Sequence, residues 1–285
     1  MTDGVLVVDK PAGMTSHDVV DEVRRRLHER RVGHAGTLDP DATGILILGI
    51  GKATRFLSYA QASHKRYLAV ARFGSTTSTQ DAAGELLEVK PADVTHKDVE
   101  GALPAFTGTL QQIPPMVSAV KVGGERLYKK ARRGEDVERA PRAIEVDSLV
   151  LLDFAPGEQP EATLDIVCSG GTYVRTLIHD LGQSLGCGAH MASLRRTEAG
   201  GFTEADAVAL ESVAGAAVLP MGEVVRELDR LEISEDDAVR VGHGRPLDGP
   251  TEPVRAPVAV MRDGRFLAVY RPEGDMLVAD RVVPK

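Results

Sequence analysis

The sequence predicts a mixed α and β fold without a regular βαβ series, followed by a small β-rich C-terminal part. Two observations predict this class. First, short apolar or alternating runs typical of strands are interspersed with amphipathic helical segments. Second, strand candidates dominate the sequence after Pro220. A chain of 285 residues is long enough for one large domain and a small one.

Strands are predicted where β-branched and apolar residues cluster or alternate with polar ones. In chain order they cover residues 4–9, 45–48, 66–73, 144–153, 163–168, 257–261, 265–270 and 276–283. Asp263-Gly264 is a strong hairpin signal, because both residues tolerate the positive φ of a tight turn. We place a domain boundary between about 220 and 232, which gives domains over 1–225 and 226–285.

Helices are predicted between these strands. Thr15 or Ser16 can cap the first, because a hydroxyl at the N-cap accepts a hydrogen bond from a free backbone N–H of the first turn. Its apolar face holds Val19, Val20, Val23 and Leu27. Further helices are expected over 95–105, within 119–142 as a polar helix with loose flanks, and over Thr172–Leu185, where the apolar face holds Leu177, Ile178, Leu181 and Leu185.

The composition is that of a soluble globular protein, with 42% hydrophobic and 27% charged residues. No apolar run approaches the roughly 20 residues that span a bilayer, and the N-terminus does not resemble a signal peptide, so we expect a cytoplasmic protein without a membrane segment. The two cysteines, Cys168 and Cys187, make no disulfide framework and show no metal-ligand spacing.

The net charge of −8 by itself disfavours a nucleic-acid ligand, but the charge is unevenly distributed. Residues 119–142 hold eight basic and four acidic residues, a net charge of +4. Residues 201–285 hold ten basic and sixteen acidic residues, a net charge of −6. An anionic ligand is therefore expected at the front two thirds of the chain.

The most informative stretch is Gly33-His34-Ala35-Gly36-Thr37-Leu38-Asp39-Pro40. Its two glycines allow tight backbone geometry, and Pro40 disfavours helical backbone angles at Asp39. A carboxylate is thereby held on a stiff loop between two elements, where catalytic groups often lie. For an arbitrary Asp-Pro pair, a role limited to stabilising the turn would be the simpler interpretation.

This octet, followed by Ala42, Gly44 and Leu46, resembles the signature of the bacterial tRNA pseudouridine-55 synthases, the TruB family. Four more blocks resemble the family in its own order: Lys10-Pro11-Ala12-Gly13-Met14-Thr15-Ser16, Lys65-Arg66-Tyr67, Gly171-Thr172-Tyr173-Val174-Arg175-Thr176 and Leu194-Arg195-Arg196-Thr197. The blocks span roughly residues 4–205, so the resemblance overrides the turn-only interpretation of Asp39.

The resemblance implies an α+β fold, with a mixed-sheet catalytic domain that has a central cleft and a small PUA-like β-domain over 226–285. It also implies a reaction on the T-loop uridine at position 55 of tRNA. The N-glycosidic bond breaks, the uracil turns, and a C–C bond forms through C5. This isomerisation needs neither a cofactor nor a metal.

The same resemblance implies how the reaction proceeds. Loss of uracil leaves an electron-poor C1′, which the carboxylate of Asp39 would trap as the nucleophile. The resemblance places Arg175 beside Asp39, where its guanidinium would favour the ionised carboxylate. Tyr67 would stack on or abut the uracil and could help to remove the C5 proton, although a phenol is a weak base near neutral pH.

The remaining site residues are implied to bind the substrate. Tyr173 and Leu194 would line the uracil pocket, and Lys10 would support the active-site loop. His34 would fill the gap that the target base leaves when it is flipped out of the RNA stack.

Residues 119–142 correspond in the family to an inserted segment that closes over the RNA. The basic excess and Gly123-Gly124 suit a phosphate-contacting clamp, and its ordering upon RNA binding is a hypothesis. The expected partner is the T-arm of tRNA, and we expect a monomer that binds no metal and no membrane.

Two features depart from the family pattern. Glu198 follows the LRRT block where a basic or neutral residue is expected, and the C-terminal part is acidic for an RNA-binding module. Three alternatives stay open: a tRNA-binding or tRNA-folding protein without catalysis, a pseudouridine synthase for ribosomal RNA, and an Asp-nucleophile phosphatase, which would lack its DxD motif here.

Overall fold

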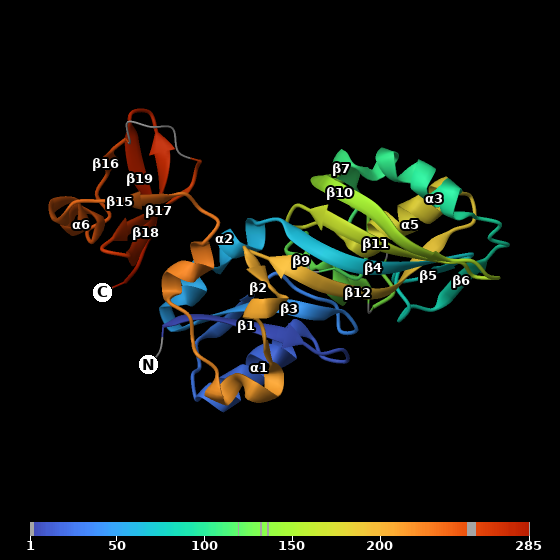
Figure 1. The fold of residues 1–285 in the computed structure, drawn as a ribbon, viewed down its shortest axis with the longest axis horizontal. Helices are drawn as coiled ribbons and strands as arrows, with labels where there is room; N and C mark the ends of the chain where they lie inside the picture. The colour runs from blue at the N-terminus through green and yellow to red at the C-terminus, as the bar shows by residue number, and fades with distance from the viewer. Residues whose placement is uncertain (1–2, 119, 132, 136, 250–254, 285) are drawn as a thin grey trace. The chain divides into compact units, whose positions relative to one another are not determined.

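The structure is a computed structural model, and it describes residues 3–118, 120–131, 133–135, 137–249 and 255–284 (Figure 1). The chain divides into two compact units. The first unit contains Met1–Pro40, Gly44–Ser63 and Ala199–Lys285, and the second contains Asp41–Thr43 and His64–Glu198. Across the residues described, no helix is both long and apolar enough to cross a bilayer.

Strand β1 (Gly4–Lys10) is central to the sheet of the first unit. It pairs antiparallel with β3 (Thr43–Ile50) and parallel with the short β14 (Val208–Ala209). Strand β2 (Val32–Ala35) pairs antiparallel with β3. The sheet therefore has mixed strand directions, and the strands predicted over 4–9 and 45–48 are confirmed.

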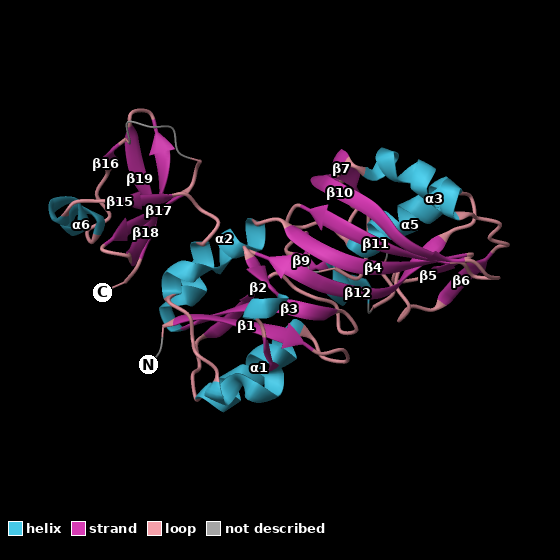
Figure 2. Cartoon of the chain, in the orientation of Figure 1, coloured by secondary structure: helices cyan, strands magenta, loops and turns pink. Residues whose placement is uncertain are grey.

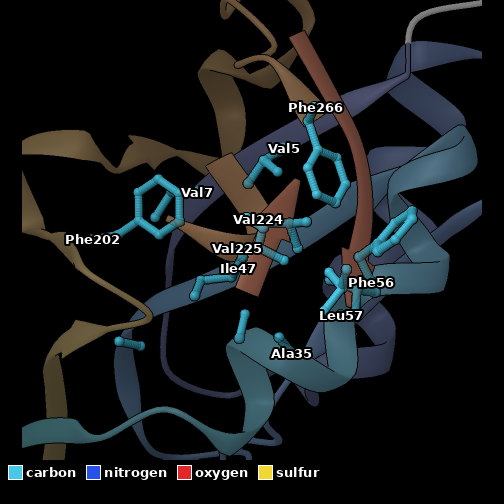
Figure 3. Packing of buried hydrophobic residues seen from close by; sticks show 14 of the residues in the cluster. Val5, Val7, Ala35, Ile47, Phe56, Leu57, Phe202, Val224, Val225 and Phe266 are labelled. Atoms are coloured by element: carbon cyan, nitrogen blue, oxygen red, sulfur yellow. The ribbon is translucent and has the colours of Figure 1, made fainter. Parts of the chain in front are cut away.

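Both faces of this sheet are buried, which explains why β1 and β3 read as continuous apolar runs. On one face, Val5 and Val7 pack in a cluster with Phe56, Phe202 and Phe266 (Figure 3). On the other face, alternate residues of the same strands, such as Leu6 and Val8, pack beneath the first helix. The two-residue period of a strand thus supplies both clusters.

Helix α1 (Ser16–Leu27) has Thr15 as its N-cap. The Thr15 side chain accepts a hydrogen bond from the Asp18 backbone N–H at 3.1 Å, and the Asp18 carboxylate accepts one from the Thr15 N–H at 2.8 Å. Of the two candidate caps, Thr15 is therefore the one used. The predicted face is confirmed, with Val19, Val20 and Val23 buried and Leu27 packed at its edge.

Figure 2 shows helices, strands and loops in separate colours, and short elements complete the first unit outside its C-terminal sheet. They are η1 (Gly51–Phe56), α2 (Leu57–Ala62), β13 (Phe202–Thr203), η3 (Glu204–Asp206), η4 (Leu210–Gly215) and η5 (Met221–Val225).

A five-stranded sheet forms the C-terminal part of the chain, in the order β15-β17-β18-β19-β16. Its elements are β15 (Arg230–Glu232), α6 (Glu235–Val241), β16 (Leu247–Asp248), β17 (Val258–Arg262), β18 (Arg265–Glu273) and β19 (Met276–Val282). The predicted hairpin is confirmed at Asp263 and Gly264, whose φ values are 49° and 71°. This small β-rich part is consistent with a PUA-like domain, whereas the boundary at 225/226 stays a prediction.

The second unit is built on an antiparallel arrangement of β4 (Lys65–Phe73), β11 (Glu161–Cys168), β10 (Arg142–Ala155) and β7 (Gly108–Gln112). Strand β12 (Ala189–Ala199) neighbours β4. Alternate residues of β4 and β11 are buried, which is the two-residue period of a sheet with one covered face. The strands predicted over 66–73, 144–153 and 163–168 are confirmed.

The helices of the second unit are α3 (His96–Ala102), α4 (Leu127–Ala131) and α5 (Val174–Ser184), with the 3-10 helix η2 (Leu103–Phe106) after α3. Strands β5 (Ser75–Thr77) and β6 (Leu86–Val89) form a separate pair. The helix predicted over 95–105 ends early as an α-helix, because Pro104 has no N–H to donate and the last turn tightens into η2.

The polar helix predicted within 119–142 is confirmed as the short α4. The segment before it forms a hairpin that was not predicted, in which β8 (Lys121–Val122) and β9 (Glu125–Arg126) are joined through Gly123-Gly124. Both glycines have positive φ, at 63° and 83°, so the turn competes with the helix pattern. Residues 119, 132 and 136 of this predicted clamp lie outside the described residues.

Candidate active site

Asp39 lies in the loop that leads from β2 to β3, and it is half-buried. Gly36, just after β2, has a φ of 87°, a left-handed conformation that a residue with a Cβ rarely adopts. The glycine of the octet therefore turns the chain out of β2. Asp39 follows three residues later, directly before Pro40.

The ammonium group of Lys10 holds the end of this loop. Lys10 is fully buried at the end of β1, and its Nζ donates to the carbonyl oxygens of Pro11 at 2.8 Å, Met14 at 2.6 Å and Pro40 at 2.8 Å. The Gly13 backbone N–H also donates to Pro40 O, at 3.0 Å. The residue after Asp39 is thus anchored twice, which agrees with a supporting role for Lys10. A direct contact of Lys10 with the substrate stays a prediction.

His34 lies on β2, half-buried and opposite Leu48 of β3. It is in the same unit as Asp39 and Lys10, so the first unit contains three of the predicted site residues. The predicted role of His34 in filling the place of a flipped base stays a prediction.

The second unit holds the other four predicted site residues: Tyr67, Tyr173, Arg175 and Leu194. Tyr67 is 7% exposed on the covered face of β4. Tyr173 is the N-cap residue of α5, and Leu194 lies on β12; both are half-buried. Asp39 and Arg175 belong to different units, and their predicted approach stays a prediction.

Arg175 is a buried cation in the first turn of α5. Its side chain is 5% exposed, and its Nη1 lies 3.1 Å from Oδ2 of Asp81 in an ion pair. Its Nη2 donates to the Val117 carbonyl oxygen at 2.5 Å, and its Cζ lies 5.9 Å from the centre of the Tyr173 ring. Buried charges are normally paired, so these contacts explain how the guanidinium is retained away from water.

Asp81, the ionic partner of Arg175, was not predicted from the sequence. Its second oxygen accepts hydrogen bonds from Thr79 Oγ1 at 2.5 Å and from the Ala83 N–H at 3.1 Å, which orients the carboxylate. A buried arginine requires an anionic partner, but the chain has 42 acidic residues, and nothing in the local sequence of Asp81 distinguishes it.

The unexpected Glu198 is paired in the structure. The Arg66 guanidinium donates to both oxygens of Asp165, at 2.9 and 2.7 Å, and its Nη1 donates to Glu198 Oε1 at 3.1 Å. These carboxylates raise the pKa of Arg66 above its ordinary value, with Asp165 the larger influence. Glu198 thus forms part of an exposed ion cluster on the second unit, and its charge is partly compensated there.

One group among the described residues has the chemistry of metal ligands, although no metal site was predicted. The ligand atoms of His64, Glu145 and Asp147 lie within 4.8 Å of one another on an exposed part of the second unit. His64 Nδ1 lies 2.5 Å from Asp147 Oδ2, so a direct hydrogen bond accounts for this pair. The cluster includes none of the predicted site residues.

Comparison with known proteins identifies the family of this chain. The model of the TruB family pseudouridylate synthase (N terminal domain) matches residues 24–174, and that of the tRNA pseudouridylate synthase B C-terminal domain matches residues 175–234. The tRNA pseudouridine synthase B of Symbiobacterium thermophilum is 50% identical over 85% of this chain and 82% of its own. The tRNA pseudouridine synthase B of Thermobifida fusca is 46% identical over 94% of each chain.

Solved structures agree with this assignment. A chain from the crystal structure of a Cbf5-Nop10-Gar1 complex is 26% identical and superposes with a TM-score of 0.78, covering 99% of this chain and 87% of that one. A chain of an H/ACA RNP bound to a substrate RNA containing 2'-deoxyuridine gives a TM-score of 0.75 at 24% identity, a likeness of fold. The chain therefore belongs to the TruB family of pseudouridylate synthases and is a pseudouridine-forming isomerase.

Proposed function

We propose that the protein converts the T-loop uridine at position 55 of tRNA to pseudouridine, with Asp39 as the nucleophile. The observation that carries the proposal is the anchored loop: a half-buried carboxylate lies directly before a residue that Lys10 and Gly13 both hold. The family assignment and the names of the curated relatives support tRNA as the substrate.

The reaction breaks one bond and forms another within the same nucleotide. As the N1–C1′ bond breaks, its electrons leave with the uracil, and the Asp39 carboxylate bonds to the electron-poor C1′. After the uracil turns, C5 replaces the carboxylate at C1′, and loss of the C5 proton restores the aromatic ring. No atom is lost from the nucleotide overall, because N1 gains the proton that C5 gives up.

The second unit would bind the base. Tyr67, largely buried on β4, would lie against the uracil, and Tyr173 and Leu194 would line the same pocket. Arg175 would supply positive charge that favours an ionised carboxylate. Its pairing with Asp81 supports this role, because a guanidinium with a fixed partner keeps one orientation.

The RNA would be distorted to reach the site. A base stacked in a folded loop must be flipped out before its glycosidic bond is accessible, and His34 would occupy the position it leaves. The segment over 119–142 would contact phosphates, although Arg133 is already paired with Glu125 at 2.8 Å and Glu135 at 2.7 Å. Its contribution to RNA binding therefore depends on the other basic residues of the segment.

The direct test is tritium release from C5-labelled uridine in a T-arm RNA, comparing the unchanged protein with Asp39→Asn. Asp41→Asn is the matched control, because it makes the same substitution at an exposed position of the same loop. We expect release by the unchanged protein and by Asp41→Asn, and none by Asp39→Asn with the RNA still bound. Sequencing of the product locates the pseudouridine.

Other outcomes separate the alternatives. Tight, specific RNA binding without release by the unchanged protein would contradict the reaction on this substrate and favour a tRNA-folding role. Release from ribosomal RNA fragments but not from the T-arm would reassign the substrate. Equal protease sensitivity of the segment over 119–142 with and without tRNA would count against its closing on the RNA.

A further inference from the structure

The hydroxyl of Ser16 holds the loop residue that precedes Asp39. Ser16 is 2% exposed, and the Leu38 backbone N–H donates to its Oγ at 2.9 Å. The same Oγ donates to the Leu38 carbonyl oxygen at 3.1 Å. Because Thr15 caps α1, the Ser16 hydroxyl is directed to the loop, where it satisfies both peptide groups of one residue.

The side-chain amide of Gln112 does the same in the second unit. Gln112 is 4% exposed at the end of β7. Its Oε1 accepts a hydrogen bond from the Tyr173 N–H at 2.8 Å, and its Nε2 donates to the Tyr173 carbonyl oxygen at 3.0 Å. Tyr173 is the N-cap of α5 and has no side-chain cap of its own, so Gln112 sets how the helix that carries Arg175 begins.

We infer that Ser16 and Gln112 are positioning residues for the reaction, one for Asp39 and one for the Tyr173–Arg175 turn. Each is a buried side chain that donates to and accepts from the backbone of a single residue, directly before Asp39 in one unit and two residues before Arg175 in the other. The inference rests on the proposed function, in which these residues act on the uridine.

The physical reason is that catalysis is more sensitive to small displacements than folding is. A shift of about 1 Å at a reacting group can lower a rate about 100-fold, although most of the fold is unaffected. A single bond to Leu38 or Tyr173 would permit rotation about that bond. Two hydrogen bonds, one to the N–H and one to the carbonyl oxygen of the same residue, remove that freedom. Ser16 and Gln112 therefore each restrict both the position and the tilt of the backbone they bind.

The test measures single turnover of a full-length tRNA transcript by Ser16→Ala and Gln112→Met, which remove the polar atoms and keep most of the volume. We expect the rate constant to fall about 10- to 100-fold for each variant, with tRNA affinity within about twofold. The amplitude should stay near that of the unchanged protein, since a purely structural role would lower the fraction of active enzyme instead.

Ser63→Ala is the matched control. Ser63 Oγ also binds two backbone groups in the first unit, donating to Ala60 O at 2.7 Å and accepting from the Gly200 N–H at 3.0 Å, outside the predicted site. We expect its rate constant to equal that of the unchanged protein. Ser16→Thr, which restores the hydroxyl, should recover most of the rate.

A variant that fails to fold is replaced by a milder one. Ser16→Cys weakens the hydrogen bonds at similar volume, and Gln112→Asn shortens the reach by one methylene; both should still lower the rate constant. An unchanged rate constant in folded Ser16→Ala or Gln112→Met would overturn the inference for that residue. If Asp39→Asn also kept full activity, the proposed function itself would fail, so the two failures are distinguishable.

Discussion

The loop that carries Asp39 and the turn that carries Arg175 are held by opposite means. Around Asp39, the buried cation of Lys10 donates to three neutral carbonyl groups, which lie 1, 4 and 30 residues away in the chain. Around Arg175, the buried cation is itself a predicted site residue, and its partners Asp81 and Val117 are 94 and 58 residues away in the chain. These contacts of Lys10 thus span at most 30 residues, whereas those of Arg175 span many more.

The difference predicts different responses to substitution. Replacing Lys10 removes the buried charge together with its hydrogen bonds to three carbonyl groups, which are neutral acceptors. Replacing Asp81 removes a partner and leaves the guanidinium buried. Breaking a buried ion pair from one side costs more than the pair itself contributes, because the remaining charge is uncompensated.

The largest effect is therefore expected for Asp81→Asn, which keeps the shape of the side chain and removes its negative charge. We expect a loss of about 3 kcal/mol in the free energy of unfolding and a single-turnover rate about 100-fold lower. Urea denaturation and tritium release measure the two quantities. Asp153→Asn, at an exposed position of β10 in the same unit, is the control and should change neither. An unaffected rate would show that the ion pair does not orient Arg175 for the reaction.

For Lys10→Met we expect a smaller loss in the free energy of unfolding, about 2 kcal/mol. The three carbonyl acceptors of Lys10 are neutral, and Pro40 O keeps its hydrogen bond from the Gly13 N–H. Lys52→Met provides the comparison, since Lys52 Nζ has one carbonyl acceptor, Pro284 O at 3.0 Å. Chemical denaturation of both variants measures the difference. If Lys10→Met lowered the free energy of unfolding as much as Asp81→Asn, the distinction between the surroundings of Lys10 and those of Arg175 would be contradicted.

The smallest expected effect is the pH dependence of stability that arises from a buried thiol. It concerns the second unit, which contains both cysteines. Burial raises the pKa of the Cys168 thiol to about 11, from 9.0. Since the pKa of Cys168 is higher in the folded than in the unfolded protein, the thiol's contribution to the free energy of unfolding is fully present below pH 9. It is lost as the pH rises towards 11. We expect the free energy of unfolding to fall by about 1 kcal/mol by pH 10, and Cys168→Ala to remove this part of the slope. Denaturation series at pH 8 and pH 10 provide the measurement, and equal slopes in both proteins would refute it.

Much of the fold could be predicted from periodicity. The buried runs of β1 and β3, the alternation in β4 and β11, and the apolar face of α1 follow directly from the spacing of apolar residues. The hairpin that precedes α4 could not be predicted in this way. Its strands, β8 and β9, have two residues each, too few to show a period, and the turn between them depends on Gly123-Gly124.

The predicted site residues divide in the same way. The sequence by itself determined that the loop of Asp39 is stiff, because Gly36 and Pro40 restrict the backbone at or beside their own positions. Only the tertiary structure decided that Asp81 pairs with Arg175 and that Gln112 holds Tyr173, 61 residues away. A buried charge or an uncapped helix end requires a partner. Many similar side chains could supply it, and the pairing of the strands decides which one does.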